Sequence, residues 1–287
     1  MHHDNFAFMA SLGYSGMEPQ RVVDSLAALG YGGVEWTLAH ADPESKTPEQ
    51  LAELIEITLQ GGLVASEICV QQDLVCLDDG ERRRRIEFVK ECLRALSAAG
   101  ADTFNLFTGP APWVPTAPRV GRDIGEGRAW AQVLEAFDEF VAEAERLQVH
   151  LAVEGVWGHL CHDYYTTRLL IDHYNSPWLG VNFDPSHDVL AGRLDVGWIA
   201  KQWGDRIKHM HLKDAVGIQE EGKFVFPLLG EGNVDWKGLF TALDEIDYQG
   251  FLSVEFESFT YLRQVLGDDI EEAARLSMEQ IKRLVQL

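Results

Sequence analysis

Basic residues are scarce in this sequence, and long apolar runs are absent. The 287 residues include 24 Lys and Arg against 46 Asp and Glu, which gives a formal net charge of −22 and an isoelectric point near 4.7. Nucleic acids and anionic membranes select basic surfaces, so this acidity argues against both as partners. No run approaches the ~18–20 apolar residues of a membrane helix, and the first residues do not have the pattern of a signal peptide. We therefore expect a soluble, cytoplasmic protein.

Cysteine is also scarce, and the glycine-rich motifs of nucleotide-binding folds are missing. The four cysteines form no CxxC pair and no small disulfide framework, which favours a reduced, cytoplasmic setting. Neither GxGxxG nor GxxxxGK followed by Ser or Thr occurs, and this weakens an open, doubly wound sheet as the fold. A hydrophobic fraction of 46% is ordinary for a globular protein with a sizeable core.

Short apolar runs alternate with amphipathic helical segments along the whole chain. Alternating strands and helices predict a parallel sheet, and about eight such units predict that the sheet closes into a barrel. We therefore expect a single (β/α)8 TIM barrel domain over residues 1–287, with the open sheet as the alternative. The expected strands lie within Phe6–Ala10, Gly32–Trp36, Leu63–Ile68, Ala101–Phe107, Leu151–Gly155, Gly180–His187, Ile207–Asp214 and Leu252–Ser258. The expected helices are Pro19–Leu29, Thr47–Gly61, Glu81–Ala99, Glu126–Leu147, Tyr165–Tyr174, Asp195–Trp203, Trp236–Ile246 and Ile270–Leu287.

The last four expected strands each end near a residue that can bind a divalent metal. These residues are Glu154, Asp184, His211 and Glu255. The C-terminal ends of parallel barrel strands converge on one face, so the four side chains should share one site. Three carboxylates there would repel one another without a cation. We expect one divalent ion, with Mn²⁺ as the first choice and Mg²⁺, Co²⁺ or Zn²⁺ as alternatives, because three oxygens and one nitrogen suit all of them.

Other polar and aromatic residues lie near the same strand ends. His187 follows Asp184 by three residues and is a candidate for orienting a substrate hydroxyl or a bound water. Lys213 could stabilise a developing oxyanion or be an ordinary surface lysine. Glu257 is either a substrate contact or the partner in a salt bridge. His209 shares a strand face with His211 but lies one layer deeper, which favours packing or support of the ligands over metal binding.

Residues from the earlier strands and loops complete the expected site. Glu35 and Glu67 end the second and third strands, and either could reach the metal. Gly109–Asp123, the longest Pro- and Gly-rich stretch, follows the fourth strand and is either a substrate wall or a surface loop. Further candidates on loops of the same face are His40, Trp113 and His159.

Four sequence motifs resemble those of one superfamily of sugar-converting enzymes. They are NFDPSH (182–187), HMHLKDA (209–215), GEGNVDW (230–236) and YQGFLSVEFE (248–257). Over essentially the whole chain, the sequence resembles the sugar isomerase/epimerase superfamily with the xylose isomerase-like barrel, which also contains inosose dehydratases and endonuclease IV. The resemblance implies that Glu154, Asp184, His211 and Glu255 bind the metal and that His187 binds the substrate.

The resemblance also implies a reaction. In the epimerases, the ligand glutamates that end strands five and eight act as the acid/base pair, so Glu154 and Glu255 would exchange a proton at a carbon next to a carbonyl. The metal would acidify that C–H and hold the enediolate. We therefore expect a divalent-metal-dependent sugar isomerase or epimerase, whose partner is a small sugar or sugar derivative. Members of the superfamily often form dimers or tetramers, but these residues fix no number.

Two departures from the ketohexose epimerases leave the substrate open. Those enzymes carry an arginine six residues after the metal histidine, where this chain has Gly217. Their polar, substrate-contacting run after the strand-five glutamate is replaced here by GVWGHLCH (155–162), in which Trp157 and His159 would build a different pocket. A larger, cyclic or oxidised sugar would fit such a pocket. The alternative reaction is therefore that of a lyase or dehydratase acting on a 3-keto sugar, a keto-glycoside or an inosose.

Two further alternatives belong to other functional classes. Endonuclease IV needs extra histidines near the ends of the early strands, which end here in VASEI and FNLF. Together with the negative charge, this argues against DNA repair. A non-catalytic sugar-binding protein is disfavoured because all four ligand positions are filled.

Overall fold

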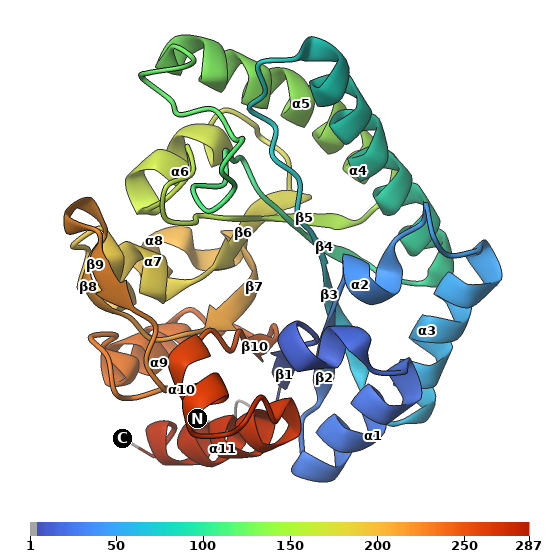
Figure 1. The fold of residues 1–287 in the computed structure, drawn as a ribbon, viewed down its shortest axis with the longest axis vertical. Coiled ribbons are helices and arrows are strands. Elements are labelled where there is room, and N and C mark those ends of the chain that lie inside the picture. The colour runs from blue at the N-terminus through green and yellow to red at the C-terminus, as the bar shows by residue number, and fades with distance from the viewer. Residues whose placement is uncertain (1–4, 287) are drawn as a thin grey trace.

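Eight parallel strands form a closed barrel in the structure, a computed structural model that describes residues 5–286 (Figure 1). The strands follow one another around the barrel in chain order, and the last pairs with the first, with Phe6 opposite Leu252. The single-domain TIM barrel is therefore confirmed, and the open sheet is wrong. The strands are β1 (Phe6–Met9), β2 (Gly33–Thr37), β3 (Val64–Val70), β4 (Thr103–Leu106), β5 (His150–Glu154), β6 (Leu179–Phe183), β7 (Ile207–Leu212) and β10 (Leu252–Val254).

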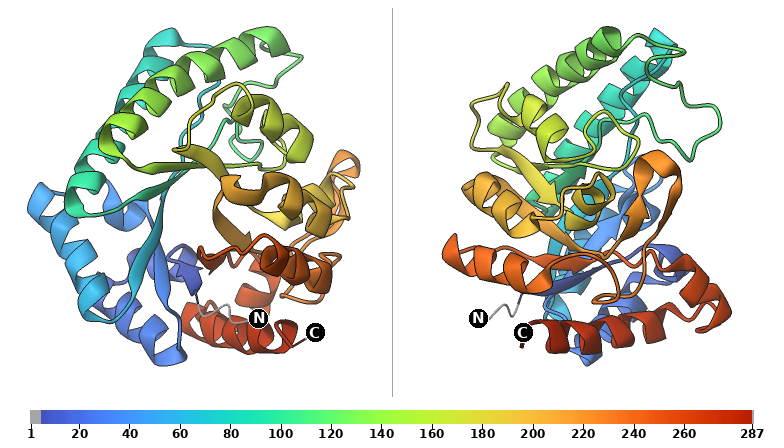
Figure 2. Two further views of the ribbon diagram at one scale, coloured as in Figure 1. Left: turned by 180° about the vertical axis from the view of Figure 1, so that it is seen from behind. Right: turned by 90° about the vertical axis from the view of Figure 1, so that its left-hand side faces the viewer.

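Helices surround the barrel, as both views of Figure 2 show. Their ends follow local sequence signals: Thr47 and Gln50 form a capping box at the start of α3, and Gly100 ends α4 with a φ of +110°. Each expected helix has a counterpart within a few residues, and the residue expected last, Leu287, lies outside the described part. The counterparts are α1 (Pro19–Leu29), α3 (Pro48–Gln60), α4 (Asp79–Ala99), α5 (Glu126–Leu147), α6 (Tyr164–Ile171), α8 (Val196–Trp203), α9 (Trp236–Glu245) and α11 (Ile270–Leu284).

Several short elements were not predicted from the sequence. The loop after β7 forms an antiparallel hairpin of β8 (Val216–Ile218) and β9 (Lys223–Val225). Each of these strands has only three residues, too few to show an alternating pattern. The other unpredicted elements are the short helices α2 (Leu38–Ala41), α7 (Pro185–Leu190) and α10 (Phe259–Gln264), together with the 3₁₀ turns Leu12–Gly16, Gly204–Arg206 and Gln219–Glu221.

The barrel register brings the C-terminal strand ends to one level. Glu154 of β5 lies opposite Asn182 of β6, and His211 of β7 lies opposite Ser253 of β10. The register shifts at two places, between Val34 and Glu35 and between Val181 and Asn182. Such irregularities re-aim side chains next to functional sites, and the residues that follow the two shifts, Glu35 and Asn182, both contact His211.

The structure also shows the state of the cysteines, the loop after β4 and the character of the helices. All four cysteines are buried and free. Gly109–Asp123 is a loop, as expected, with a single bridge between Val120 and Ile124 at its end. Among residues 5–286, no helix is both long and apolar enough to cross a membrane.

Candidate metal centre and active site

Four side chains from four different strand ends meet at the C-terminal mouth of the barrel. Glu154, Asp184, His211 and Glu255 each offer one ligand atom, and these atoms lie within 4.8 Å of one another. The Nδ1 atom of His211 lies 3.4 Å from Oε1 of Glu154, 3.2 Å from Oε2 of Glu255 and 4.0 Å from Oδ2 of Asp184. The structure thus brings together the four residues that the sequence predicted as ligands.

Neighbouring groups hold two of the carboxylates so that one oxygen of each faces the centre. The side chain of Asn105 donates a hydrogen bond to Oε2 of Glu154 at 2.7 Å, which leaves Oε1 next to His211. Asp184 caps α7, where the N–H of Ser186 donates to Oδ1 at 2.8 Å. Oδ2 of Asp184 faces the ammonium of Lys213, and Nδ1 of His211 faces the carboxylates of Glu154 and Glu255. Two fixed carboxylates and an imidazole nitrogen that faces them are donors that fit a divalent ion.

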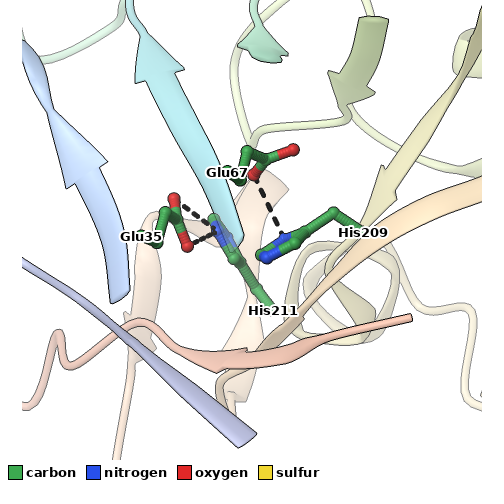
Figure 3. Close-up of side chains that lie close together, drawn as sticks. All are labelled: Glu35, Glu67, His209 and His211. Atoms are coloured by element: carbon green, nitrogen blue, oxygen red, sulfur yellow. Dashed lines mark hydrogen bonds and ion pairs between the residues drawn. The ribbon is translucent and has the colours of Figure 1, made fainter. Parts of the chain in front are cut away.

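The opposite edge of His211 contacts a fourth carboxylate, that of Glu35 (Figure 3). Its Nε2 atom lies 3.1 Å from both oxygens of Glu35, and the side-chain nitrogen of Asn182 lies 3.0 Å away. Deeper in the barrel, Nδ1 of His209 lies 3.1 Å from Oε2 of Glu67 and 3.3 Å from Oδ1 of Asn182. Asn182 therefore connects the two histidines, a role that the sequence pattern did not reveal.

Glu35, Glu67, His209 and His211 also lie close enough to one another to hold a metal. This inner group differs from the first because burial favours the neutral forms of Glu67 and His209. Burial, with help from the charge of Glu35, raises the pKa of Glu67 well above its usual range. Burial also lowers the pKa of His209 to about 4. A protonated carboxyl is a poor ligand, and no member of the inner group lines the cavity over the barrel mouth. The geometry therefore favours the group of Glu154, Asp184, His211 and Glu255 as the metal centre.

Strong local charges set the protonation of that group. Burial alone would raise the pKa of Glu154, but His211, His187 and Lys213 hold it well below its usual range. Burial likewise opposes ionisation of Asp184, while Lys213 and His187 lower its pKa. Both carboxylates are therefore ionised at neutral pH. Metal binding requires this form.

His187 and Lys213 lie at the edge of the centre, and both are buried. The N–H of Trp157 donates to Nδ1 of His187 at 3.3 Å, and Nε2 of His187 lies 3.4 Å from Oδ2 of Asp184. The ammonium of Lys213 is 2.9 Å from Oδ2 of Asp184 and also pairs with Glu255. Despite burial, these carboxylates raise the pKa of Lys213 well above its usual range. A buried lysine with such contacts is not an ordinary surface residue.

Glu257 is the third carboxylate next to Lys213. Its Oε2 atom lies 3.1 Å from the ammonium nitrogen. Burial raises the pKa of Glu257, an effect that Lys213 opposes and Glu255 strengthens. Glu257 also lines the cavity, so the structure combines the two roles considered for it, salt-bridge partner and potential substrate contact.

A cavity of about 840 Å³ opens above the centre. Its base includes Glu154, His187, Lys213, Glu255 and Glu257, and its walls are largely apolar. Ligand pockets of roughly 300–1,000 Å³ accommodate drug-sized molecules. The apolar and aromatic lining residues are Met9, Cys69, Phe107, Trp113, Val156, Trp157, Phe224, Val225, Phe226, Pro227, Leu228, Phe259, Tyr261 and Val265.

Two expected loop histidines lie away from this cavity. His159 is buried behind Trp113, with ring centroids 5.4 Å apart, and lines a neighbouring cavity instead. Its role in substrate binding stays a prediction. His40 packs against Trp36, and its Nε2 lies 3.0 Å from the carbonyl oxygen of Met17, which is a structural contact.

Comparison with known proteins identifies the family. Residues 23–284 match the xylose isomerase-like TIM barrel family. The chain belongs to this family. Against the D-psicose 3-epimerase of Enterocloster bolteae, it is 26% identical over 258 residues, which cover 88% of this chain and 80% of the relative.

Two further comparisons differ in how much of the chain they cover. The inosose dehydratase of Bacillus thuringiensis is 34% identical over 101 residues, which cover 31% of this chain and 34% of the relative. The crystal structure of IolI protein with a binding zinc atom superposes with a TM-score of 0.76 at 17% identity and covers 98% of both chains. The first is a local similarity, and the second shows that the fold is shared.

Proposed function

We propose that this protein is a divalent-metal-dependent enzyme that moves a proton at a carbon next to the carbonyl of a sugar-like polyol. Isomerisation or epimerisation is the leading reaction. The observation that carries the proposal is the meeting of Glu154, Asp184, His211 and Glu255 below an open cavity, with Glu154 and Glu255 lining that cavity. The names of the relatives support an enzyme that acts on sugars, because they include an epimerase of a ketohexose and dehydratases of inosose.

The four residues would hold one divalent ion. When bound, the ion would polarise the substrate carbonyl and acidify the neighbouring C–H. Mn²⁺ is our first choice among the ions that suit three carboxylate oxygens and one imidazole nitrogen. Mg²⁺, Co²⁺ and Zn²⁺ suit the same donor set.

Glu154 and Glu255 would transfer the proton. Both carboxylates line the cavity, Glu154 at the end of β5 and Glu255 directly after β10, and each has an oxygen near His211. One carboxylate would take the proton from the carbon next to the carbonyl, and the other would return a proton to the opposite face. General acid–base catalysis of this kind typically contributes about 10²–10⁴-fold in rate.

The other residues at the base would bind and orient the substrate. His187 is held by the N–H of Trp157, which donates to Nδ1, and its Nε2 atom lies beside Glu154, Asp184 and the ammonium of Lys213. Lys213 would donate to a substrate oxygen, and Glu257 would accept from a hydroxyl. Trp113 and Trp157 would form the wall of the pocket.

Glu35 would position the metal ligand His211. For Nδ1 to bind an ion, the ring proton must lie on Nε2, which is the atom that faces Glu35 at 3.1 Å. A carboxylate that accepts this proton fixes the tautomer and the ring orientation and makes the imidazole a better donor. This contact supports a positioning role for Glu35 outside the metal shell.

A lyase or dehydratase is the second candidate, favoured by the placement of Lys213. The same proton removal next to a carbonyl can be followed by cleavage of the C–O bond at the next carbon. The departing oxygen then takes a proton from the glutamate that removed one, and the ammonium of Lys213 lies at the base of the cavity, where it could stabilise the negative charge that develops on that oxygen. The local 34% identity with inosose dehydratase supports this reading.

Deuterium exchange from solvent tests the proposal. Mn²⁺-loaded protein would be incubated in D₂O with a panel of ketoses, inososes and 3-keto glycosides, and the substrates would be followed by NMR. We expect deuterium to appear at one carbon next to the carbonyl. A retained skeleton with inverted configuration would identify an epimerase, and an unsaturated product would identify a lyase. Protein that holds its metal but exchanges no C–H in the panel would contradict the proposal.

A further inference from the structure

Aromatic rings form a continuous series from the outer rim of the cavity to the metal centre. Trp113 lies at the rim and is 47% exposed, and its ring centroid is 5.7 Å from that of Trp157. Trp157 is 4.8 Å from Phe224, and Phe224 is 5.7 Å from Phe226. Phe226 in turn is 5.8 Å from the buried ring of His187.

Separate chain segments supply these rings. Trp113 comes from the loop after β4, Trp157 from the loop after β5, and Phe224 from strand β9 of the hairpin. Phe259 and Tyr261 of α10 line the cavity from another segment. The loops that differ most among TIM barrels therefore converge here to build one apolar wall, and loop residues at this face determine which substrate a barrel accepts.

The rim of the cavity carries exposed apolar side chains, which lie beside the polar Gln71, Glu231, Thr260 and Gln264. Trp113, Val225, Phe259 and Val265 all line it, and they are 47%, 59%, 37% and 61% exposed. Exposed apolar patches of this kind mark binding sites. Apart from Glu231, the charged residues of the lining lie at the base, where Lys213 is 4.8 Å from the ring centroid of Phe226. One end of the ligand is therefore expected to be polar, and the other end to be flat and apolar.

We propose that the substrate is a glycoside, in which a keto sugar binds at the metal centre and an aromatic aglycone binds against the Trp113, Trp157, Phe224 and Phe226 wall. This inference rests on the proposed function only for the sugar end. Aromatic pairs prefer offset or edge-to-face arrangements with centroids 4.5–7 Å apart, and tilted side-chain rings can offer both to a flat ligand. A cavity of about 840 Å³ leaves ample space above a single sugar ring.

Paired ligands that differ only in the aglycone test the inference without requiring turnover. Binding of phenyl and methyl glucosides, as both anomers, would be measured by calorimetry on Mn²⁺-loaded protein. We expect one phenyl anomer to bind at least tenfold more tightly than its methyl counterpart. Trp113→Ala should reduce this preference at least threefold. Phe259→Ala, at a lining residue of α10, provides a second variant, which should also reduce the preference.

Trp198→Ala is the matched control. Trp198 is 42% exposed on α8 and lies outside the cavity, so its loss should leave both affinities unchanged. Equal affinities for phenyl and methyl glucosides in the wild-type protein would overturn the inference. Cellobiose that binds as tightly as the phenyl glucoside would also overturn it, because the wall would then serve a second sugar. A change in oligomeric state in the Trp113→Ala variant would also overturn the inference, because the rim would then be a subunit interface.

The exchange assay separates this inference from the proposed function. Deuterium exchange in small keto sugars, combined with no preference for phenyl glucoside, would overturn only the aglycone site. Tight and Trp113-dependent binding of phenyl glucoside, combined with no exchange in any keto sugar, would overturn only the proposed reaction.

Discussion

The Nε2 atom of His211 lies 3.1 Å from both carboxylate oxygens of Glu35, although 176 residues separate the two in the chain. The other ring nitrogen of His211 faces Glu154, Asp184 and Glu255. One imidazole thus joins the inner cluster of the barrel to the metal centre. Its orientation decides which nitrogen is available as a ligand.

Replacing Glu35 should therefore weaken metal binding without removing a ligand. In Glu35→Gln, the side-chain amide can present an N–H to Nε2 and favour the wrong tautomer of His211. Loss of such a supporting carboxylate typically lowers metal affinity about 10–100-fold. Titration with Mn²⁺, followed by paramagnetic resonance of the free ion, measures the change.

Glu67→Gln is the control for this prediction. Glu67 is equally buried but pairs with His209, so it should affect Mn²⁺ affinity much less than Glu35→Gln. Equal losses in the two variants would show a general disturbance of the barrel interior. An unchanged Mn²⁺ affinity in Glu35→Gln would exclude the positioning role.

The two glutamates that line the cavity should be needed for proton transfer. Glu154→Gln and Glu255→Gln keep the size of the side chain and remove its basicity, so we expect at least about 10²-fold slower deuterium exchange in each. Exchange rates by NMR, at Mn²⁺ concentrations that saturate each variant, separate catalysis from metal loss. Glu257→Gln, in the same cavity, should keep its metal and lose mainly substrate affinity. Wild-type exchange rates in either of the first two variants would refute the assignment.

Lys213 should oppose metal binding while stabilising the metal-free protein. Its ammonium contacts Asp184 and Glu255, which are also proposed metal ligands. In Lys213→Met, the carboxylates lose their cation, so the melting temperature without metal should fall and its rise on adding Mn²⁺ should exceed that of the wild type. Lys201→Met, which removes a surface pair with Glu245, should change neither quantity. A smaller rise in Lys213→Met than in the wild type would contradict the expected competition.

His159 should make the fold sensitive to acid. Burial lowers its pKa to about 3, and neither ring nitrogen has a hydrogen-bond partner among the described residues. Because the folded-state pKa lies below the unfolded value of about 6.5, its contribution to stability is complete above pH 6.5 and is lost as the pH falls toward 3. At pH 5 the loss amounts to about 2 kcal/mol relative to neutral pH.

His159→Phe should remove this loss, because Phe cannot be protonated. Urea unfolding at pH 7.5 and 5.0 measures the difference, and the variant should lose about 2 kcal/mol less than the wild type between the two values. His173→Phe, at an exposed position, is the control. The same loss in wild type and His159→Phe would show that His159 does not contribute.

The barrel and its four central residues follow from the sequence because both depend on local patterns. A run of apolar residues predicts a strand, and topology alone brings the ends of parallel strands to one face. For this reason Glu154 and His211 were placed correctly without any knowledge of their contacts. The supporting residues Glu35, Asn105 and Asn182 could not be assigned in this way, since their roles depend on which strands become neighbours and on shifts in register.

The sequence predicts less well which residues line the pocket, and the physical reason differs from residue to residue. Phe224 and Phe226 lie in or next to a strand of three residues, which is too short to give a pattern. His159 was expected in the pocket but follows Gly158, whose φ of +79° turns the chain against Pro112. A side chain's direction after such a turn depends on tertiary packing and not on spacing in the sequence.

Metal stoichiometry tests the central claim most directly. Purified protein would be stripped of metal, exposed to Mn²⁺, Mg²⁺, Co²⁺ or Zn²⁺ in turn, desalted and analysed by mass spectrometry, alongside Asp184→Asn. We predict one tightly held ion per chain with at least one of these metals, and less than a tenth of that amount in Asp184→Asn. A wild-type protein that retains no ion, or an Asp184→Asn variant that retains a full one, would contradict the account.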